Sequence, residues 1–272
     1  MPAHKTKQVA FVATCAALYA IAIALTASIP TPWGVGQFRP GVVVPAIYAF
    51  IGGASVAGWG AAVGTFIGSF ILQAAGTGLG PLGSLVSGSP ANFVGFYLLG
   101  WFVTKFKSWS AFVLGSFVSL LIGNLVAAVG VVFYLTYVFP TWATMMLSVK
   151  LGTIVGLTLF WTVTMIPFVL VVVPLVVVAL NRTQLTSIEV SYLRSGKSRD
   201  LICSCVIVAV ILGVIYALIV GTDLGNLLFA AVVRPANIFW VKTLFATTAV
   251  IMVAIGIVGA LLVSRPTQSK SS

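Results

Sequence analysis

The feature that most constrains this chain is a series of long apolar runs separated by short polar segments. Of its 272 residues, 60% are hydrophobic and 6% are charged, whereas a soluble domain is about 45–50% apolar and about 25% charged. About 20 helical residues cross the hydrocarbon core of a bilayer, and several of the runs reach that length. The composition therefore excludes a soluble globular fold and predicts a protein embedded in a membrane.

The apolar runs also indicate which kind of membrane fold to expect. Lipid cannot hydrogen-bond to the backbone, so only helices and closed β-barrels span a membrane. Barrel strands alternate apolar and polar residues, whereas these runs are continuous. We therefore expect an all-α polytopic bundle of about eight spans. The spans cover approximately residues 9–29, 41–51, 54–75, 90–104, 110–139, 151–180, 201–220 and 243–263.

The distribution of basic residues predicts the orientation of the spans. We expect both termini in the cytoplasm, because the positive-inside rule places most Lys and Arg residues there. The residues then expected on the cytoplasmic side are Lys5, Lys7, Lys105, Lys107, Arg182, Arg194, Lys197, Arg199, Arg265 and Lys270. The outer side receives only Arg39, Lys150, Arg234 and Lys242. Basic residues that are scattered between apolar runs predict a multi-pass cell-membrane protein in contact with lipid. Because they form no single basic face, they argue against nucleic acid as a partner.

Polar segments divide the chain into four expected parts. Residues 1–182 form a six-span core, 183–200 a basic cytoplasmic linker, 201–263 a two-span C-terminal hairpin and 264–272 a short disordered tail. Within the core, the glycine pair at 52–53 separates the short second span from the third.

Catalytic and ion-coupling groups are scarce. The chain has three acidic residues, Glu189, Asp200 and Asp223, and all of them lie in predicted loops. Carriers driven by protons or sodium often hold the ion on a carboxylate within the membrane, so self-powered transport is disfavoured. The single histidine, His4, lies near the N-terminus, the three cysteines lie in or beside spans, and the chain has no Walker-type phosphate loop. We expect no enzymatic activity, no metal site and no cofactor.

Arg39 is the charged residue best suited to binding a solute. It follows a turn-rich loop, residues 30–38, and immediately precedes a span at the expected outer face. A guanidinium group there can hold an anionic solute, and an arginine at this depth can also serve only as an anchor that reaches the membrane surface. Lys150, at the outer start of the sixth span, presents the same two possibilities.

Four uncharged residues near the outer half complete the candidate site. Trp33 and Gln37 belong to the loop before Arg39, Asn92 lies at the start of the fourth span and Asn124 lies within the fifth. Asn124 is costly in lipid unless it is paired, so we expect it to face the bundle interior. Hydrogen bonding between helices also explains Asn124, and an interfacial aromatic belt also explains Trp33.

Two spans carry stripes of small residues. Ala16, Ala20 and Ala24 recur every fourth residue in the first span, and residues 60–68 of the third span form a GxxxGxxxG row. Such rows let a second helix approach closely. Packing within the chain is the simpler interpretation for the third span, whereas for the first span we expect the stripe to be a docking surface for a second subunit.

A family resemblance follows from the first two thirds of the pattern. The first span is alanine-rich, a loop ends at Arg39 and continues as Pro40-Gly41-Val42-Val43-Val44-Pro45, and a glycine-rich run follows through residues 52–64. In these features residues 9–180 resemble the substrate-binding S components of energy-coupling factor (ECF) vitamin transporters. The resemblance implies a six-helix, N-in/C-in subunit that captures a scarce water-soluble micronutrient at the outer face. It also implies docking through the first span on a coupling subunit that two ATPases drive.

The two spans after the linker exceed the six of the resembled family. They are interpretable as an appended hairpin that binds a partner or replaces part of the coupling subunit. Two other functions stay open. A stand-alone facilitator or channel for a small solute would be revealed by flux through this chain alone, and a structural or assembly membrane protein would be excluded by saturable ligand binding.

Overall fold

The computed structural model describes residues 2–26, 29–182, 197–230 and 237–263. Within these ranges the chain contains helices and no strand, which confirms the predicted all-α fold. The elements are α1 (Pro2–Thr26), the 3-10 helix η1 (Pro40–Val42), α2 (Val43–Ala74), α3 (Gly80–Val86), α4 (Gly88–Phe106), α5 (Trp109–Val138), α6 (Pro140–Ala143), α7 (Leu147–Arg182), α8 (Ser198–Gly221), α9 (Leu224–Phe229) and α10 (Asn237–Val263).

Six of the described helical segments are long and apolar enough to cross a membrane, with mean hydropathy between 1.7 and 2.9 over 18 residues. They are Lys5–Thr26, Pro40–Ala74, Trp109–Val138, Leu147–Asn181, Ser198–Gly221 and Ile238–Leu261. This count is lower than the eight spans expected from the sequence. Two expected spans, 41–51 and 54–75, lie in the single segment Pro40–Ala74, and the expected span 90–104 corresponds to α4, which is less apolar. The basic linker up to residue 196 and the tail 264–272 lie outside the described residues.

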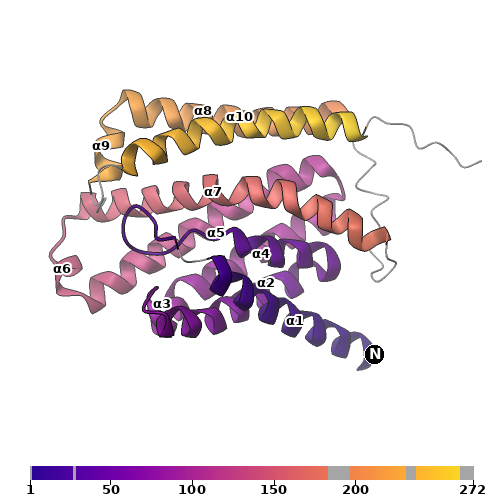
Figure 1. The fold of residues 1–272 in the computed structure, drawn as a ribbon, viewed down its shortest axis with the longest axis horizontal. Coiled ribbons are helices and arrows are strands. Elements are labelled where there is room, and N and C mark those ends of the chain that lie inside the picture. Colours follow the sequence, from indigo (N-terminus) through magenta and orange to yellow (C-terminus); the bar gives the residue numbers. More distant parts are fainter. Residues whose placement is uncertain (1, 27–28, 183–196, 231–236, 264–272) are drawn as a thin grey trace, which may run out of the picture.

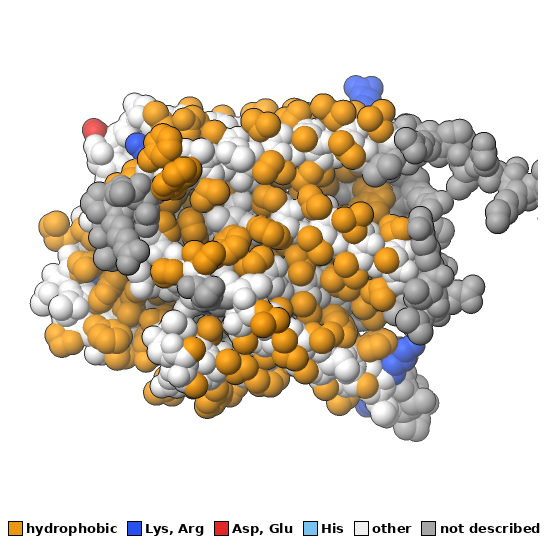
Figure 2. All heavy atoms as spheres, viewed as in Figure 1, with side chains coloured by type: hydrophobic (Ala, Val, Ile, Leu, Met, Phe, Trp, Pro, Cys, Tyr) orange, Lys and Arg blue, Asp and Glu red, His pale blue; other side chains and the backbone are white. Residues whose placement is uncertain are grey.

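The outer surface of the bundle is suited to lipid. Figure 2 shows hydrophobic side chains spread over the whole length of the visible face, with charged side chains near its two ends. Large apolar side chains that are more than half exposed occur on α1, α7 and α10, such as Leu25, Leu175 and Val250. A multi-pass membrane protein accounts for this surface, because water would make it an aggregation hazard.

Helix α2 reverses the direction of the chain at Gly53. This glycine has φ 73° and ψ −164°, a conformation outside the helical region that side-chain-bearing residues rarely adopt. In the arm before Gly53, the Tyr48 hydroxyl donates a hydrogen bond to Thr14 Oγ1 at 3.0 Å, and Gly41 packs on Ala22. Residue numbers therefore rise along this arm as they fall along α1. The break that the sequence indicates at 52–53 is present, and the first arm of α2 is antiparallel to α1.

The second arm of α2 runs parallel to α1 and packs closely on it. A Cβ added at Gly64 would lie 2.7 Å from the carbonyl oxygen of Ala16, and one at Gly68 would lie 3.2 Å from Ile23. The GxxxGxxxG row is thus used inside the chain, as the simpler interpretation had it. Glycine is required here because any side chain would separate the two helices.

This packing corrects the expectation for the alanine stripe of α1. Ala16 and Ala20 are 2% and 3% exposed, and Ala16 lies against Gly64 of α2. They are therefore not available to a docking partner. Ala24 is exposed, as is Ala17 on the outward face of α1. The small residues of α1 consequently serve two faces, one of which is already covered by the same chain.

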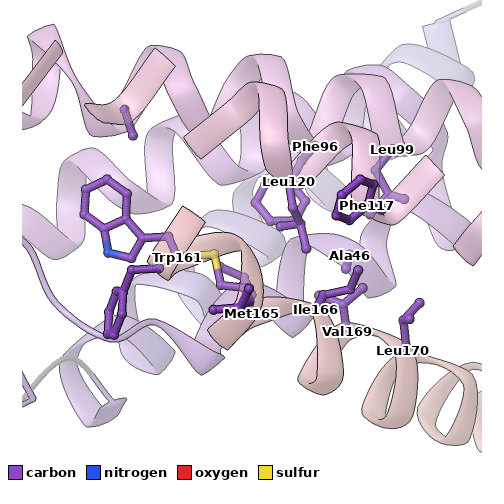
Figure 3. Close-up of a cluster of buried hydrophobic side chains, with 14 of the residues drawn as sticks. Ala46, Phe96, Leu99, Phe117, Leu120, Trp161, Met165, Ile166, Val169 and Leu170 are labelled. Carbon is purple, nitrogen blue, oxygen red and sulfur yellow. The ribbon is translucent and has the colours of Figure 1, made fainter. Parts of the chain in front are cut away.

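The remaining helices pack in sequence order. Helix α4 lies between α2 and α5, where Gly100 is packed on Ala54 and Gly95 on Gly123. Helix α7 runs along the length of the bundle, and the antiparallel pair α8 and α10 packs over α7 and α5 (Figure 1). Helices α2, α4, α5 and α7 enclose an apolar core, in which Trp161 and Met165 lie at one end and Leu170 at the other (Figure 3).

Candidate functional site

The loop that carries three of the candidate residues is folded tightly on itself. The Phe38 amide donates to the Ile29 carbonyl at 2.8 Å, and the Thr31 amide donates to the Gly36 carbonyl at 3.1 Å. Gly36 has a φ of +75°, which lets the chain turn within a few residues. The loop therefore has one defined shape, and it directs Gln37 and Arg39 towards the interior of the bundle.

Trp33 points in a different direction from the other loop residues. Its side chain is 3% exposed and its Nε1 donates to the Leu228 carbonyl of α9 at 3.1 Å. The ring stacks on Phe229 at 6.1 Å between centroids and meets the edge of Phe160 at 6.0 Å. Trp33 is thus enclosed by α7 and α9, and the structure gives it a role in joining the loop to the C-terminal helices.

Arg39 lies beside Trp161 without a hydrogen-bond partner for its Nε. The Trp161 Nε1 donates to the Gln37 carbonyl at 3.0 Å, which fixes the ring. The guanidinium carbon of Arg39 lies 5.8 Å from the centre of that ring, a distance suited to a cation–π interaction. The Arg39 Nε is buried, and its N–H finds no hydrogen-bond acceptor among the described residues. A buried, unsatisfied charged group is unfavourable, so this arginine is a candidate for binding something from outside the chain.

One small cavity extends from Arg39 between α4, α5 and α7. We call it the apolar cavity, and it is lined by Arg39, Val42, Ala91, Asn92, Gly95, Phe96, Leu99, Ser119, Leu120, Gly123, Asn124, Ala127, Trp161 and Met165. Figure 3 shows Phe96, Leu99 and Leu120 on one side of the cluster and Met165 on the other. Asn124 is 7% exposed and its Nδ2 donates to Thr162 Oγ1 at 3.2 Å. Asn124 therefore faces the bundle interior, and it has a partner within the chain.

A second cavity extends from Arg39 towards the loop side. We call it the hydroxyl cavity, and it is lined by Ile23, Gly36, Gln37, Arg39, Thr65, Ser69, Leu72, Gly78, Leu79, Gly80, Ser84, Ser87, Gly88 and Val131. Gly76, Gly78 and Gly80 all have φ between 70° and 78°, so the segment over this cavity has a fold that depends on glycine. Arg39 thus lies between an apolar cavity and one rich in hydroxyl groups.

Asn92 connects three helices next to these cavities. Its Nδ2 donates to Thr65 Oγ1 at 2.9 Å and to the Gly88 carbonyl at 2.8 Å, and its Oδ1 accepts from the Tyr19 hydroxyl at 3.3 Å. Tyr19 is fully buried. The amide therefore satisfies polar groups of α1, α2 and α4 at once.

We expect Asn92→Leu to destabilise the protein by about 1–3 kcal/mol, because it leaves the buried Tyr19 hydroxyl without a partner. The measurement is thermal unfolding in mild detergent. Asn226→Leu is the matched control, since Asn226 is exposed and its Nδ2 donates to Asp223 Oδ1 at 3.5 Å. Equal effects of the two substitutions would contradict a structural role for the Asn92 network.

The structure brings four of the six sequence candidates together and leaves two apart. Gln37, Arg39, Asn92 and Asn124 line the cavities, whereas Trp33 and Lys150 line neither. The Lys150 Nζ donates to the Ala143 carbonyl at 3.3 Å in an exposed setting. Lys150 therefore stabilises the α6–α7 turn.

Ser119 is a residue of the apolar cavity that the sequence did not single out. It is 2% exposed, and its Oγ has no hydrogen-bond partner among the described residues. A serine in an apolar helix carries little signal by itself, because it usually bonds to its own helix backbone. Only the packing of α5 reveals that this hydroxyl faces the same cavity as Arg39.

The two cavities are small. Their volumes are about 20 and 40 Å³, room for roughly one or two water molecules each, whereas pockets for drug-sized ligands occupy about 300–1,000 Å³. Binding of a larger solute would require the surrounding segments to move apart. The described residues contain no cluster of three or more His, Cys, Asp or Glu side chains that could hold a metal ion. Comparison with protein-family models, with curated proteins and with solved structures gives no match for this chain.

Proposed function

We propose that this chain is the membrane-embedded capture subunit for uptake of a small, water-soluble, vitamin-like micronutrient. Partner ATPases, acting through a transmembrane coupling subunit, energise the transport. The observation that carries the proposal is Arg39, a cation with an unsatisfied buried Nε at the junction of two cavities. Asn92, Gln37 and Asn124 surround the same junction. A few polar groups converging in an otherwise apolar site are typical of small-molecule recognition.

The proposed topology has eight crossings with both termini in the cytoplasm of a bacterial or archaeal cell. The reversal at Gly53 supports it, because each arm of α2 then counts as a separate pass. The alternating helix directions bring seven basic residues of the described chain to one end: Lys5, Lys7, Lys105, Lys107, Arg182, Lys197 and Arg199. Arg39, Lys150 and Lys242 lie towards the opposite end. This asymmetry favours the first end as cytoplasmic, and it puts the Arg39 cavities on the outer side. Arg194, Arg234, Arg265 and Lys270 lie outside the described residues.

Access for the solute follows from the segments that line the hydroxyl cavity. The glycine-rich stretch 76–80 and the loop 29–38 are the two non-helical segments beside Arg39. Helices of the core pack side by side through glycines and cannot separate at small cost. We therefore assign the opening movement to residues 76–80, because a Cβ at Gly76 would meet nothing within 4 Å, whereas the loop 29–38 is closed by hydrogen bonds between its own ends.

The energy source is assigned to partners because the chain carries few groups that could bind a driving ion. The two described acidic residues, Asp200 and Asp223, are exposed at the start and just beyond the end of α8. The third, Glu189, lies outside the described residues. A carboxylate near the middle of a span is the usual site for a coupling ion, and the sequence supplies none.

A partner is expected to dock on the outward face of α1. Ala17→Leu changes that face without touching the α1–α2 contact, and it should leave solute binding intact while it reduces recovery of the coupling and ATPase subunits. The measurement is affinity purification of tagged protein from native membranes in mild detergent, followed by mass spectrometry. Ala254→Leu on the exposed face of α10 is the matched control. Recovery of the same ATPase subunits with both variants would rule out docking through α1, and recovery of none with the wild type would argue against the energised subunit.

One observation favours a second function, a stand-alone facilitator. Helices α8 and α10 pack over α7 and α5 within the same chain, so the chain itself covers a surface of α7 and α5 that is then closed to a partner. The two functions differ in flux through proteoliposomes that contain this chain alone. The capture subunit is expected to bind solute without passing it, whereas a facilitator equilibrates the solute across the vesicle membrane.

A further inference from the structure

The charge of Arg39 lacks a counterion in the described part of the chain. The two described carboxylates are exposed on α8 and just before α9, and Asp223 Oδ1 already accepts from Asn226. The nearest compensating group is the Trp161 ring, whose attraction for a cation is much weaker than that of a carboxylate. A buried positive charge is favourable only when an anion or several hydrogen-bond acceptors complete it.

The lining of both cavities limits the anion to one charged group. Arg39 is the sole cationic side chain among the lining residues of either cavity. A planar guanidinium pairs best with a planar carboxylate, which offers two acceptor oxygens side by side. A multiply charged group would leave part of its charge buried and unpaired in this setting.

The apolar cavity defines a second part of the ligand. Phe96, Leu99, Leu120 and Met165 offer carbon surfaces, and the Ser119 hydroxyl is the unpartnered polar group facing them. Once the surrounding segments move apart, a hydrocarbon chain or a ring suits such a lining, because polar atoms there would lose their hydration.

The hydroxyl cavity defines a third part. The hydroxyls of Thr65 and Ser87 donate to the Ala61 and Gly83 carbonyls. Ser69 likewise donates to its own helix backbone. Thr65 Oγ1 also accepts from Asn92 Nδ2 at 2.9 Å. Since each of these three hydroxyls uses its one proton on a backbone carbonyl, its oxygen offers a ligand only the lone pairs that remain, as an acceptor. A ligand that reaches this side is therefore expected to carry N–H or O–H donors.

We propose that the captured solute is a small organic monocarboxylic acid, held by Arg39 through its carboxylate, with an apolar part in the apolar cavity and hydrogen-bond donors directed to the hydroxyl cavity. This inference rests on the proposed function and adds the chemical class of the solute. Arg39 then determines the selectivity for an acid over its neutral analogues, because the amide of the same acid has no charge to pair with the guanidinium.

The test identifies the small molecules that stay bound to the tagged protein when it is purified from its own membranes in mild detergent. Mass spectrometry compares the wild type with Arg39→Gln, Arg39→Lys and the charge control Lys105→Gln, which removes an exposed cation at the other end of the bundle. We expect the wild type and Lys105→Gln to retain an organic acid. Arg39→Gln should retain at least about tenfold less of it, and Arg39→Lys an intermediate amount, because charge-assisted hydrogen bonds are lost.

Thermal unfolding of the ligand-free proteins separates binding from folding. Arg39→Gln should unfold at a temperature no lower than the wild type, because it removes a half-buried charge whose buried Nε has no partner among the described residues. A retained molecule that is neutral or cationic, or equal retention by Arg39→Gln, would overturn the carboxylate assignment and leave the capture function standing. Retention of phospholipid alone, or of nothing, by the wild type would contradict the capture function itself.

Discussion

Replacing Gly64 by leucine is expected to separate α1 from α2 and to destabilise the protein by about 3 kcal/mol. A Cβ at this position would lie 2.7 Å from the Ala16 carbonyl oxygen and 3.1 Å from the Tyr19 Cβ. The nearest atom belongs to the backbone, which cannot move aside as a flexible side chain does. Helix α1 packs mainly on α2. Its contacts with α4, which Tyr19 makes with Asn92 and Phe96, are at the same level as Gly64 and would be strained by the same separation.

Two measurements check this expectation. The unfolding temperature in detergent should fall, and the Cys15 thiol, which is fully buried against the glycine row, should become reactive to a maleimide in a Cys203→Ser background. Gly213→Leu is the matched control, because a Cβ at Gly213 meets nothing within 4 Å. If Gly64→Leu keeps both the stability and the Cys15 protection of the control, the α1–α2 contact has been described incorrectly.

The helical class and the chain breaks were accessible from the sequence because each has a local cause. Apolar runs of sufficient length specify helices in lipid whatever their neighbours are. The glycine pair at 52–53 marks a break because only glycine reaches φ 73° at low cost. Counting crossings was harder, since a reversal inside a continuous apolar stretch changes direction without a polar loop. The glycine pair therefore predicts two spans within Pro40–Ala74, whereas the continuous hydropathy of this segment indicates one.

Which helix packs on a given face of α1 could not be predicted from the sequence. A stripe of small residues indicates that another helix packs closely on it. It does not indicate whether that helix belongs to the same chain or to a partner. For this reason the alanine stripe predicts a docking surface at Ala16 and Ala20, whereas both residues are buried within the chain, Ala16 against Gly64 in the second arm of α2. Gly64 lies more than 40 residues from Ala16 in the sequence.

Some residues of the candidate site are recognisable from the sequence, and the roles of others depend on long-range packing. Arg39 stood out because a charge in an apolar chain is costly wherever it is buried. Ser119 gave no signal, since only its packing leaves the hydroxyl without a partner. Trp33 was grouped with Arg39 because the two are close in the loop, but its partner Leu228 is 195 residues away along the chain. Contacts of that separation depend on how the last helices fold back, which local patterns do not specify.

Trp33 provides the second large expected effect. Trp33→Ala should destabilise the protein by about 3–5 kcal/mol, the usual cost of truncating a buried aromatic residue. It removes the stack on Phe229 and the edge contact with Phe160, and it leaves the Leu228 carbonyl without its donor. The loss falls on the junction between the loop 29–38 and α9, so the C-terminal helices should loosen at that end first.

Hydrogen exchange measured by mass spectrometry in detergent locates this loosening. The amides of residues 224–229 should exchange faster in Trp33→Ala, while those of α4 and α5 stay protected. Trp240→Ala is the matched control, because Trp240 is 65% exposed on α10 and its removal should leave exchange in α9 unchanged. If both substitutions leave α9 protected, Trp33 does not join the loop to the hairpin. Because Gln37 and Arg39 belong to the same tightly bonded loop, solute retention in Trp33→Ala then reports whether the C-terminal helices support the cavity that the first six spans enclose.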